Sequence, residues 1–403
     1  MIEIAKVVGY DPLPVGRICS GTGVDDEKKF KITSCVHLEW YWLVKIDSTE
    51  TRVQIKYHNH LRKTATMFRS LPVTMAHVLD YDKAHVNVYH GYGYKDSLIV
   101  YGHVLARKAA SRTKYTNNVL SNIISLVKLF LFRPAPGVDV MLAWEEQQIF
   151  STTQRDGSFK FEWASVTAVL PGWHSVTVHV LNKQHQPTAF GEGKIFVPHI
   201  TQYGFISDID DTVLVSHSAT TGKRLRVLFT SNPRSRKTFA DVVKYYHLLS
   251  VAHTEPALPN PFFYVSSSEW NLYDYLNEFF KHNELPKGAF LLNEIKRWYQ
   301  LFKTGKTKHH GKLIKVARIL HVFPTQRFVL LGDNSQSDPE IYAAVANKYP
   351  DRIVAIYLRN ISSKKESATK KMVQSIESKE IYTCIFKHTD EAIAHSRSIG
   401  LIV

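Results

Sequence analysis

The feature that most constrains the fold of this chain is an apolar run that ends in two carboxylates. It reads Phe205-Ile-Ser-Asp208-Ile-Asp210-Asp-Thr212 and has the pattern D-x-D-x-T. If residues 203–209 form a strand, the alternation of its side chains places Asp208 and Asp210 on the same side, near the carboxyl end of the strand. Open α/β sheets bind their ligands at that end. The run therefore predicts a strand of a parallel sheet that delivers two carboxylates to a site.

Two carboxylates at this spacing suit phosphoryl transfer, because one can attack phosphorus while the other moves a proton. Covalent phosphoenzyme formation on Asp is an established catalytic strategy. Asp208 is the predicted nucleophile and Asp210 the predicted general acid and base, while the Thr212 hydroxyl is placed to donate to a carboxylate or a phosphate oxygen. The alternative interpretation is a plain acidic turn, since Asp also favours turns and helix N-caps.

A second apolar run, Pro261-Phe-Phe-Tyr-Val265, ends abruptly in Ser266, Ser267 and Ser268. Hydroxyl and backbone N–H groups at this strand end can bind a phosphate oxygen, and Ser266 is the candidate site residue. The alternative is that the serines only cap a helix that opens near Trp270.

A third apolar run, residues 327–331, is followed by Gly332-Asp333-Asn-Ser-Gln-Ser-Asp338-Pro-Glu340. We predict that Asp333 and Asp338 join Asp208 and Asp210 in an oxygen-rich Mg²⁺ site. Mg²⁺ suits the chemistry, because it binds through a few carboxylates plus substrate phosphate and neutralises charge as the phosphoryl group moves. A solvated acidic loop is the alternative.

A cation for this site is expected from the basic segment between Lys303 and Lys315, which leads into a helical pattern ending near Pro324. Lys312 opens the predicted helix and is the best candidate, since an ammonium there can hold both the nucleophile and the phosphate. The other lysines of the segment are predicted to be solvated surface residues: Lys306, Lys308 and Lys315.

Taken in order, these motifs resemble the phosphatidate phosphatase family of the fungal actin-patch type, within the haloacid-dehalogenase superfamily. The chain reads D-I-D-D-T, then F-Y-V-S-S-S-x-W-N-L-Y, then K-(x11)-P, then F-V-L-L-G-D-(x4)-D-P-E-I-Y. The resemblance extends roughly over residues 85–400. It implies a Rossmann-like, doubly wound parallel sheet, with Asp208 as nucleophile, Asp210 as acid and base, Ser266 and Lys312 as phosphate-site residues, and Asp333 with Asp338 around Mg²⁺.

The chain departs from the family pattern at two places. Before Trp270 it reads Ser-Ser-Glu269, where the family has a small residue or Asn followed by Ser-Pro, and Glu269 beside the phosphate site bears on substrate preference. After Asp333 it reads Asn-Ser-Gln, where the family often has Ser-Gly-Gln or Ser-Gly-Glu. The second change leaves Asp333 and Asp338 in register.

Composition indicates a globular protein with more than one domain, since 403 residues of 44% hydrophobic content can fill two cores. The net charge of +15 predicts attraction to polyanions, either anionic lipid surfaces or nucleic acid. Nothing resembles a nucleic-acid-binding motif, so a nucleic-acid partner is not favoured. Three scattered cysteines without metal-type spacing indicate a reducing, cytoplasmic compartment: Cys19, Cys35 and Cys384.

We find no secretion signal and no uncharged stretch long enough to span a bilayer. Residues 119–132 have apolar side chains on one helical face and basic residues at the end, which suits an interfacial segment at an anionic membrane. The alternative is a helix packed against a neighbouring domain. The protein is therefore expected to be cytoplasmic, with peripheral membrane contact.

Three segments are predicted. Residues 1–84 form an N-terminal segment without an assigned role, and residues 1–66 show no sustained periodicity. Residues 85–198 contain short alternating runs, near 86–90, 97–104, 138–144, 158–163 and 175–180, that favour an antiparallel β-sandwich-like domain. Residues 199–403 form the α/β catalytic domain, with a basic insertion at about 213–260 that either contacts an anionic substrate surface or is a solvated loop.

The leading functional hypothesis is a Mg²⁺-dependent phosphatidate phosphatase that forms diacylglycerol through an aspartyl-phosphate. The reaction class comes from the carboxylates, the hydroxyl and the lysine, whereas the lipid substrate comes from the resemblance. The alternatives are a phosphatase for another anionic phosphomonoester, such as a sugar phosphate or a nucleic-acid end, and a non-catalytic membrane-associated scaffold.

Overall fold

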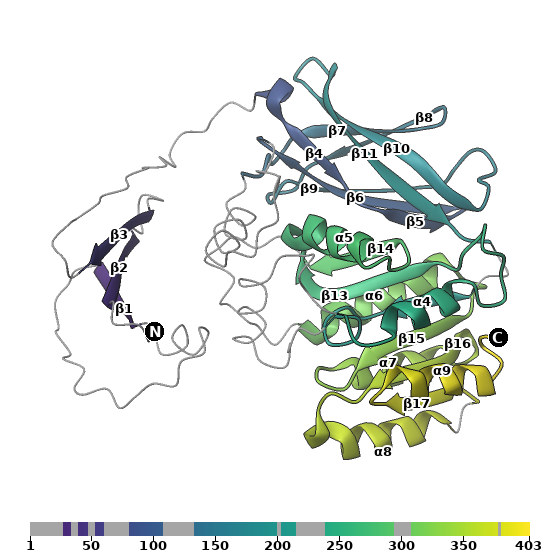
Figure 1. Cartoon of the computed structure of the whole chain (residues 1–403). Helices are drawn as coiled ribbons and strands as arrows, with labels where there is room; N and C mark the ends of the chain where they lie inside the picture. The colour runs from purple at the N-terminus through teal and green to yellow at the C-terminus, as the bar shows by residue number, and fades with distance from the viewer. Residues whose placement is uncertain are drawn as a thin grey trace. The chain divides into compact units, whose positions relative to one another are not determined.

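The computed structural model describes residues 27–33, 39–46, 53–59, 80–107, 133–199, 203–214, 238–293, 308–377 and 380–403. The chain divides into two compact units, residues 1–78 and 79–403. Within the first unit, three strands form an antiparallel sheet in the order β1-β2-β3 (Figure 1). The strands are β1 (Glu27–Thr33), β2 (Glu39–Ile46) and β3 (Val53–Asn59). The sequence did not predict these three strands, because residues 1–66 show no sustained periodicity.

The second unit begins with a β-rich part, residues 80–199. This part opens with a short 3-10 helix, η1 (Tyr81–Lys83). Its strands form one connected sheet in the order β4-β6-β5-β11-β10-β7-β8, and β9 pairs with β6. Every pairing in it is antiparallel except that of β5 with β11. The strands are β4 (His85–Val88), β5 (Gly91–Tyr94), β6 (Ser97–Leu105), β7 (Asp139–Trp144), β8 (Gln147–Thr152), β9 (Ser158–Trp163), β10 (Gly172–Leu181) and β11 (Pro187–Val197).

The five runs predicted as strands in this part are confirmed as β4, β6, β7, β9 and β10. Alternating burial along β4 and β9 gives the sheet one apolar face, which forms a core of its own around Val100, Leu142 and Val178. The predicted pattern misses β5, β8 and β11. β5 contains two glycines, and β8 and the first half of β11 are largely exposed, so their hydrophobic alternation is weak.

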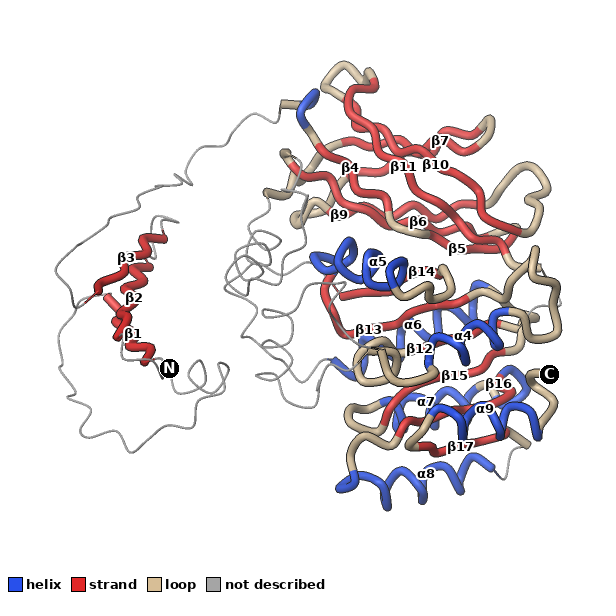
Figure 2. The backbone as a smooth tube through the Cα atoms, in the orientation of Figure 1, coloured by secondary structure: helices blue, strands red, loops and turns tan. Residues whose placement is uncertain are grey.

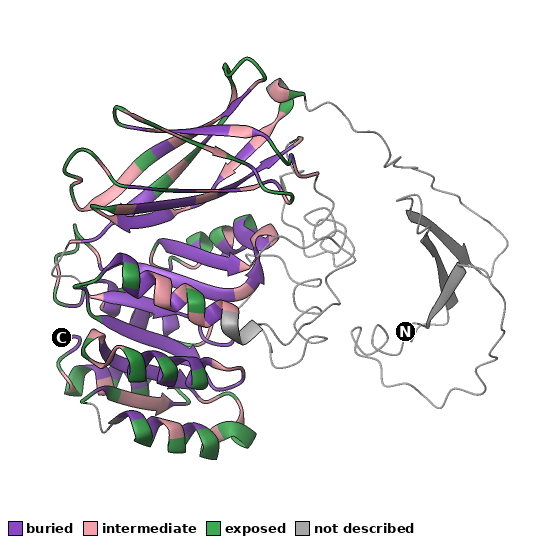
Figure 3. Ribbon diagram, turned by 180° about the vertical axis from the view of Figure 1, so that it is seen from behind, coloured by how far each residue is buried: buried purple, intermediate pink, exposed green. Residues whose placement is uncertain are grey.

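The rest of the second unit is built on a six-stranded, all-parallel sheet in the order β14-β13-β12-β15-β16-β17. The strands are β12 (Gly204–Ser207), β13 (Phe262–Glu269), β14 (Gly288–Asn293), β15 (Phe328–Asp333), β16 (Ile353–Arg359) and β17 (Tyr382–Phe386). Burial on both faces explains why the inner strands are largely apolar runs, whereas the edge strand β17 is only partly buried (Figure 3). The chain builds outward from β12 through β13 to β14 and then crosses to β15, so the topological switch point lies between β12 and β15.

Helices cover both faces of the parallel sheet (Figure 2). On one face, α4 (Val242–Ser250), α5 (Tyr273–His282) and α9 (Thr389–Ser398) pack against a set of strand residues that includes Phe205 and Leu331. On the other, α6 (Lys308–Val322), α7 (Asp338–Lys348) and α8 (Glu366–Glu377) pack against their strand neighbours, which include Ile206 and Leu330. Successive strand residues thus serve opposite faces. The described residues of this part also include the 3-10 turns η2 (Trp270–Leu272), η4 (Pro350–Arg352) and η5 (Ser363–Lys365).

The β-rich part packs against the segment that follows β13. The ring of Tyr89 stacks on that of Trp270, with 4.2 Å between the ring centroids, and the backbone N–H of His90 donates to the Tyr273 hydroxyl at 3.1 Å. Arg318 of α6 pairs with Glu162 of β9 at 2.6 Å. The two sheets of the second unit therefore share a contact next to the serine-rich strand end.

Two predicted segments lie partly or wholly outside the described residues. The amphipathic stretch 119–132 is one, and most of the basic insertion, residues 215–237, is the other. Within the described part of that insertion, residues Val242–Ser250 form α4. Among the residues that the structure describes, no helix combines the length and the apolar composition needed to cross a lipid bilayer.

Candidate active site

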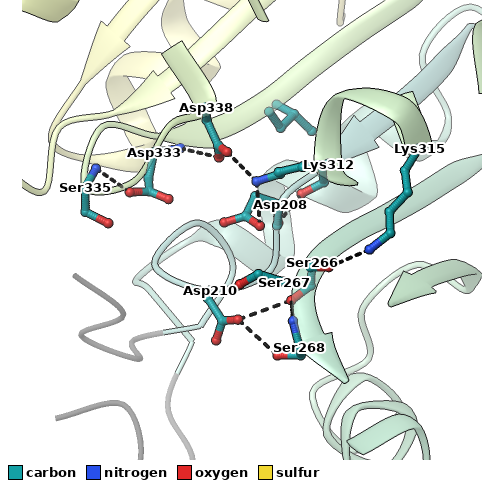
Figure 4. A network of polar contacts seen from close by, with 12 residues as sticks. Asp208, Asp210, Ser266, Ser267, Ser268, Lys312, Lys315, Asp333, Ser335 and Asp338 are labelled. Atoms are coloured by element: carbon teal, nitrogen blue, oxygen red, sulfur yellow. Dashed lines mark hydrogen bonds and ion pairs between the residues drawn. The ribbon is translucent and has the colours of Figure 1, made fainter. Parts of the chain in front are cut away.

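The candidate site lies where three neighbouring central strands end. Asp208 follows β12 directly, Ser266 lies near the end of β13, and Asp333 is the last residue of β15. Parallel strands present their carboxyl ends at the same edge of a sheet, so three segments far apart in sequence converge there (Figure 4). The structure therefore brings the predicted motifs together, with Lys312 reaching them from α6.

Asp208 and Asp210 do not extend side by side from a strand as the alternation predicts. β12 ends at Ser207, and the chain then turns, with Asp211 in the left-handed region at φ 62°. The pleat is lost before Asp210. As a result, the Asp208 carboxylate lies next to Lys312, whereas the Asp210 carboxylate lies next to Ser266 (Figure 4).

Lys312 joins two buried carboxylates. Its Nζ lies 2.8 Å from Asp208 Oδ1 and also contacts Asp338 Oδ1. Burial by itself lowers the pKa of Lys312, but the charges of Asp208 and Asp338 outweigh it and hold the pKa above the ordinary value. Lys312 therefore stays an ammonium and fixes one oxygen of the predicted nucleophile.

Burial and mutual repulsion disfavour ionisation of the clustered acids. The pKa of Asp208 is raised by burial and by Asp338, Asp333 and Asp210, against the opposing effect of Lys312. Burial and the charge of Asp338 raise the pKa of Asp333 to about 7. One lysine does not compensate these carboxylates fully, so the cluster has a deficit of positive charge.

Three of the four acids predicted to bind metal form a compact group. Carboxylate oxygens of Asp208, Asp333 and Asp338 all lie within 4.8 Å of one another. Oδ2 of Asp208 and Oδ2 of Asp333 are buried and have no hydrogen-bond partner among the described residues. Unpartnered buried carboxylate oxygens are costly unless a cation is near, and oxygen donors of this kind suit Mg²⁺. The side chains present therefore fit the predicted Mg²⁺, while a role for the Asp210 carboxylate in binding it stays a prediction.

The packing at β15 explains how Asp338 reaches this group. Asp338 is the first residue of α7, with Pro339 behind it, and its Oδ2 accepts a hydrogen bond from the Asp333 backbone N–H at 3.3 Å. A Cβ on Gly332 would lie 2.6 Å from that same oxygen, so only glycine lets the helix start approach the strand so closely.

The Asp210 carboxylate is held by the serine-rich strand end. The hydroxyls of Ser266 and Ser268 each donate to Asp210 Oδ2 at 3.2 Å, and the Ser268 N–H donates to Ser266 Oγ at 2.9 Å. Ser268 is a site residue that the motif reasoning missed, although it stands in the same serine run. Thr212 is buried, and its Oγ1 has no hydrogen-bond partner among the described residues.

Lys315 is the clearest correction at this site, because the sequence analysis places it at the surface. It is half-buried, and its Nζ donates to Asn293 Oδ1 at 2.6 Å and to the Ser266 carbonyl at 3.2 Å. The helix begins at Lys308 rather than at Lys312, so residues 312 and 315 lie within it and share an inward face. Burial and the charge of Lys312 lower the pKa of Lys315 to about 7, against an opposing effect of Glu269. For the other two lysines of the run, Lys306 and the Lys308 side chain lie outside the described residues.

This lowered pKa predicts a pH-dependent stability difference. Between pH 7 and about 10.5 the unfolded chain carries a proton on Lys315 that the folded chain has lost, so the free energy of unfolding rises with pH across this range. Lys315→Met removes that rise, which at about 1.4 kcal/mol per pKa unit is on the order of 4 kcal/mol. Urea unfolding at pH 7 and pH 10, compared with the exposed helix variant Lys281→Met, measures it. If the free energy of unfolding changed equally between pH 7 and pH 10 in the unaltered protein and both variants, the buried environment of Lys315 would be contradicted.

The second departure from the family motif has a structural role. The fully buried side chain of Asn334 accepts the backbone N–H groups of Ile361 and Ser362, both at 2.8 Å, and donates to Asn360 Oδ1 at 2.8 Å and the Ser362 carbonyl at 3.1 Å. It thereby ties the loop that follows Asp333 to the loop after β16. Lys365 reinforces that loop through the Ser335 and Gln336 carbonyls.

We expect Asn334→Ala to destabilise the protein by roughly 3 kcal/mol, because each buried group left unpaired costs about 1–3 kcal/mol. Thermal and urea unfolding measure this change. Asn347→Ala, at an exposed position of α7, is the matched control and should lie within about 0.5 kcal/mol of the unaltered protein. A loss no larger than that of the control would show that the loop does not depend on Asn334.

Comparisons with known proteins find similarity in the part of the chain that contains this site. Residues 203–360 match the family model described as the catalytic domain of phosphatidate phosphatase APP1. Phosphatidate phosphatase APP1 of Saccharomyces cerevisiae is 32% identical over 163 residues, which is 40% of this chain and 26% of that protein. An uncharacterised protein of Schizosaccharomyces pombe is 26% identical over 171 residues, 41% of this chain and 27% of that protein.

The chain thus spans about a quarter of the length of these relatives. A carbohydrate acetylesterase from Xanthomonas citri aligns with a TM-score of 0.28 and 7% identity over 76% of this chain and 70% of that one, too weak a likeness to bear on the fold. The family model spans all four motifs. The predicted resemblance to the phosphatidate phosphatase family of the fungal actin-patch type is therefore confirmed for residues 203–360, the part of the chain that builds the site.

Proposed function

We propose that this protein is a Mg²⁺-dependent phosphatidate phosphatase that releases diacylglycerol and phosphate. The observation that carries the proposal is the Asp208 carboxylate inside a group of three acids. One of its oxygens is held by Lys312, and the other has no hydrogen-bond partner among the residues that the structure describes. The match of residues 203–360 to a phosphatidate phosphatase catalytic domain supports the lipid substrate.

In the proposed mechanism Asp208 attacks phosphorus, the bond from phosphorus to the glycerol oxygen breaks, and Asp210 gives its proton to the departing alkoxide. Asp210 then takes a proton from water, which attacks the aspartyl-phosphate and restores Asp208. Lys312 holds Asp208 and attracts the phosphate throughout. Asp208, Asp333 and Asp338 would hold the Mg²⁺ ion, which would supply positive charge to the phosphoryl group when bound.

The surrounding architecture is proposed to follow the same family. We assign the parallel sheet to the doubly wound haloacid-dehalogenase type, because the chain order reverses between β12 and β15, and the β-rich part to a β-sandwich-like domain. The protein acts in the cytoplasm at the surface of anionic membranes, to which its net charge of +15 attracts it.

Phosphate release from phosphatidate in detergent micelles, beside release from a soluble phosphomonoester, tests this function. We expect Mg²⁺-dependent release that favours phosphatidate and stops on chelation with EDTA. Asp338→Asn should raise the Mg²⁺ concentration needed for half-maximal rate by about 10-fold or more, whereas the exposed Asp351→Asn should not change it.

Other outcomes separate the alternatives. Release from the soluble ester alone would keep the mechanism and discard the lipid. No release from either ester, with phosphatidate vesicles still bound, would favour a non-catalytic scaffold. Full activity in EDTA after exhaustive dialysis would contradict the metal site.

A further inference from the structure

The serine-rich end of β13 leaves the regular strand ladder. β13 pairs with β14 at Val265 with Leu291, and the next pair is Glu269 with Asn293. Four residues of advance on β13 (269 − 265) face two on β14 (293 − 291), so two extra residues bulge out within Ser266 to Ser268. Bulges re-aim side chains next to active sites, and they leave backbone groups without their ladder partners.

Two side chains replace the missing ladder partners. Lys315 Nζ donates to the Ser266 carbonyl at 3.2 Å, and Asn293 Nδ2 donates to the Ser267 carbonyl at 3.0 Å. The two side chains also bond to each other, from Lys315 Nζ to Asn293 Oδ1 at 2.6 Å. Together they connect α6 and β14 to the bulge.

The shape of the bulge decides where its hydroxyls point. Both Ser266 Oγ and Ser268 Oγ lie 3.2 Å from Asp210 Oδ2, and the Ser268 N–H bonds to Ser266 Oγ (Figure 4). A shift of the Ser266 carbonyl would turn these hydroxyls away from Asp210. Proton transfer by an acid and base such as Asp210 becomes slower when the position of its carboxylate shifts, even by a small distance.

The side chain at this contact has to supply hydrogen-bond donors. Lys315 is half-buried, and its Nζ donates to both the Ser266 carbonyl and Asn293 Oδ1. An amine and an ammonium can both make these bonds, so the contact does not depend on the charge of the lysine. An apolar side chain of similar volume would leave both oxygens without this donor, so the lysine contributes to the shape of the bulge.

We propose that Lys315 and Asn293 form a clamp that holds the bulge so that the Ser266 and Ser268 hydroxyls both face Asp210. Lys315 is then a positioning residue for the proton transfers of Asp210, and this inference rests on the proposed phosphatase function. The clamp acts through backbone carbonyls, and the substrate is not its ligand.

Steady-state kinetics with Lys315→Met, Asn293→Ala and the double variant test the role in turnover. We expect each single change to lower kcat by roughly 10- to 100-fold with KM within about twofold, below the full contribution of an acid–base group. The double variant should be no more than about threefold worse than either single one, because both remove the same clamp. In the Asp210→Asn background, Lys315→Met should change the residual rate less than about twofold.

Amide hydrogen exchange tests the clamp without any substrate. The Ser268 N–H should exchange on the order of tenfold faster in both single variants, because the bulge that protects it opens locally. Lys281→Met, an exposed lysine of α5, should leave it unchanged. If the unaltered protein turns over no ester, the proposed function fails, and the exchange experiment still decides whether the clamp exists.

Three results would overturn the proposal. Unchanged Ser268 exchange in both single variants would remove the clamp itself. Faster exchange with unaltered kcat would remove its role in positioning Asp210, and a rise in KM alone would make Lys315 a substrate-binding residue instead. If Lys315→Met does not fold, Asn293→Ala decides each of these points by itself.

Discussion

Asp208→Asn should abolish phosphate release, by roughly 10⁴-fold or more, while the protein stays folded. The substitution removes the attacking oxygen, and loss of a covalent nucleophile typically costs several orders of magnitude in kcat. Stability should hold or rise, because burial and the charges of Asp338 and Asp333 raise the pKa of Asp208 and thus oppose its ionised form. Lys312 keeps Asp338 as a partner after the substitution.

Phosphate release and urea unfolding, measured on the same preparation, check both halves of this expectation. Asp351→Asn, at an exposed aspartate in η4, is the matched control and should retain full activity. If the Asp208→Asn variant were inactive because it was unfolded, the result would not support Asp208 as the nucleophile. More than about 1% residual activity in a folded Asp208→Asn protein would contradict it.

Lys312→Met should lower both activity and stability, which distinguishes it from the nucleophile variant. Removing the ammonium leaves Asp208 and Asp338 buried without their shared cation, and breaking a buried pair in this way typically costs about 3–5 kcal/mol. We also expect at least about a 10³-fold loss of kcat, since the cation that holds nucleophile and phosphate is gone.

The pH dependence of this loss follows from its cause. Without Lys312 the folded-state pKa of Asp208 rises further above the unfolded value, so the folded chain binds more protons and stability falls as pH increases through that range. Urea unfolding at pH 5 and pH 8 should therefore show the larger deficit at pH 8. The double variant Lys312→Met with Asp338→Asn should recover part of it, and an equal deficit at both pH values would contradict the charge argument.

The central architecture could be predicted because parallel strands leave a strong mark on sequence. The runs at 205–206, 261–265 and 328–331 are apolar without interruption, since both faces of β12, β13 and β15 are buried. A polar residue follows each run within two positions, because the carboxyl ends of the strands form the site. Two local signals were therefore enough to place Asp208, Ser266 and Asp333 at one edge of the sheet.

Other features depend on contacts that no local pattern carries. The direction of Asp210 depends on the strand ending at Ser207, and the burial of Lys315 depends on where α6 begins. Asn334 holds residues from a loop that follows another strand, so its role has no counterpart in nearby sequence. The sequence therefore did not predict two kinds of feature: where the strands and helices begin and end, and which side chains bond to the backbone of distant loops.

The position of β12 between β13 and β15 sets an order of events during synthesis of the chain. β12 and β13 emerge first and can pair, but the other edge of β12 stays open until β15 has been made and inserted against it. An open apolar strand edge is a template for wrong pairing, so chaperone demand should peak in this interval. Asp208 gains Asp333 and Asp338 only when the gap closes, and metal binding would then report that the centre of the sheet is complete.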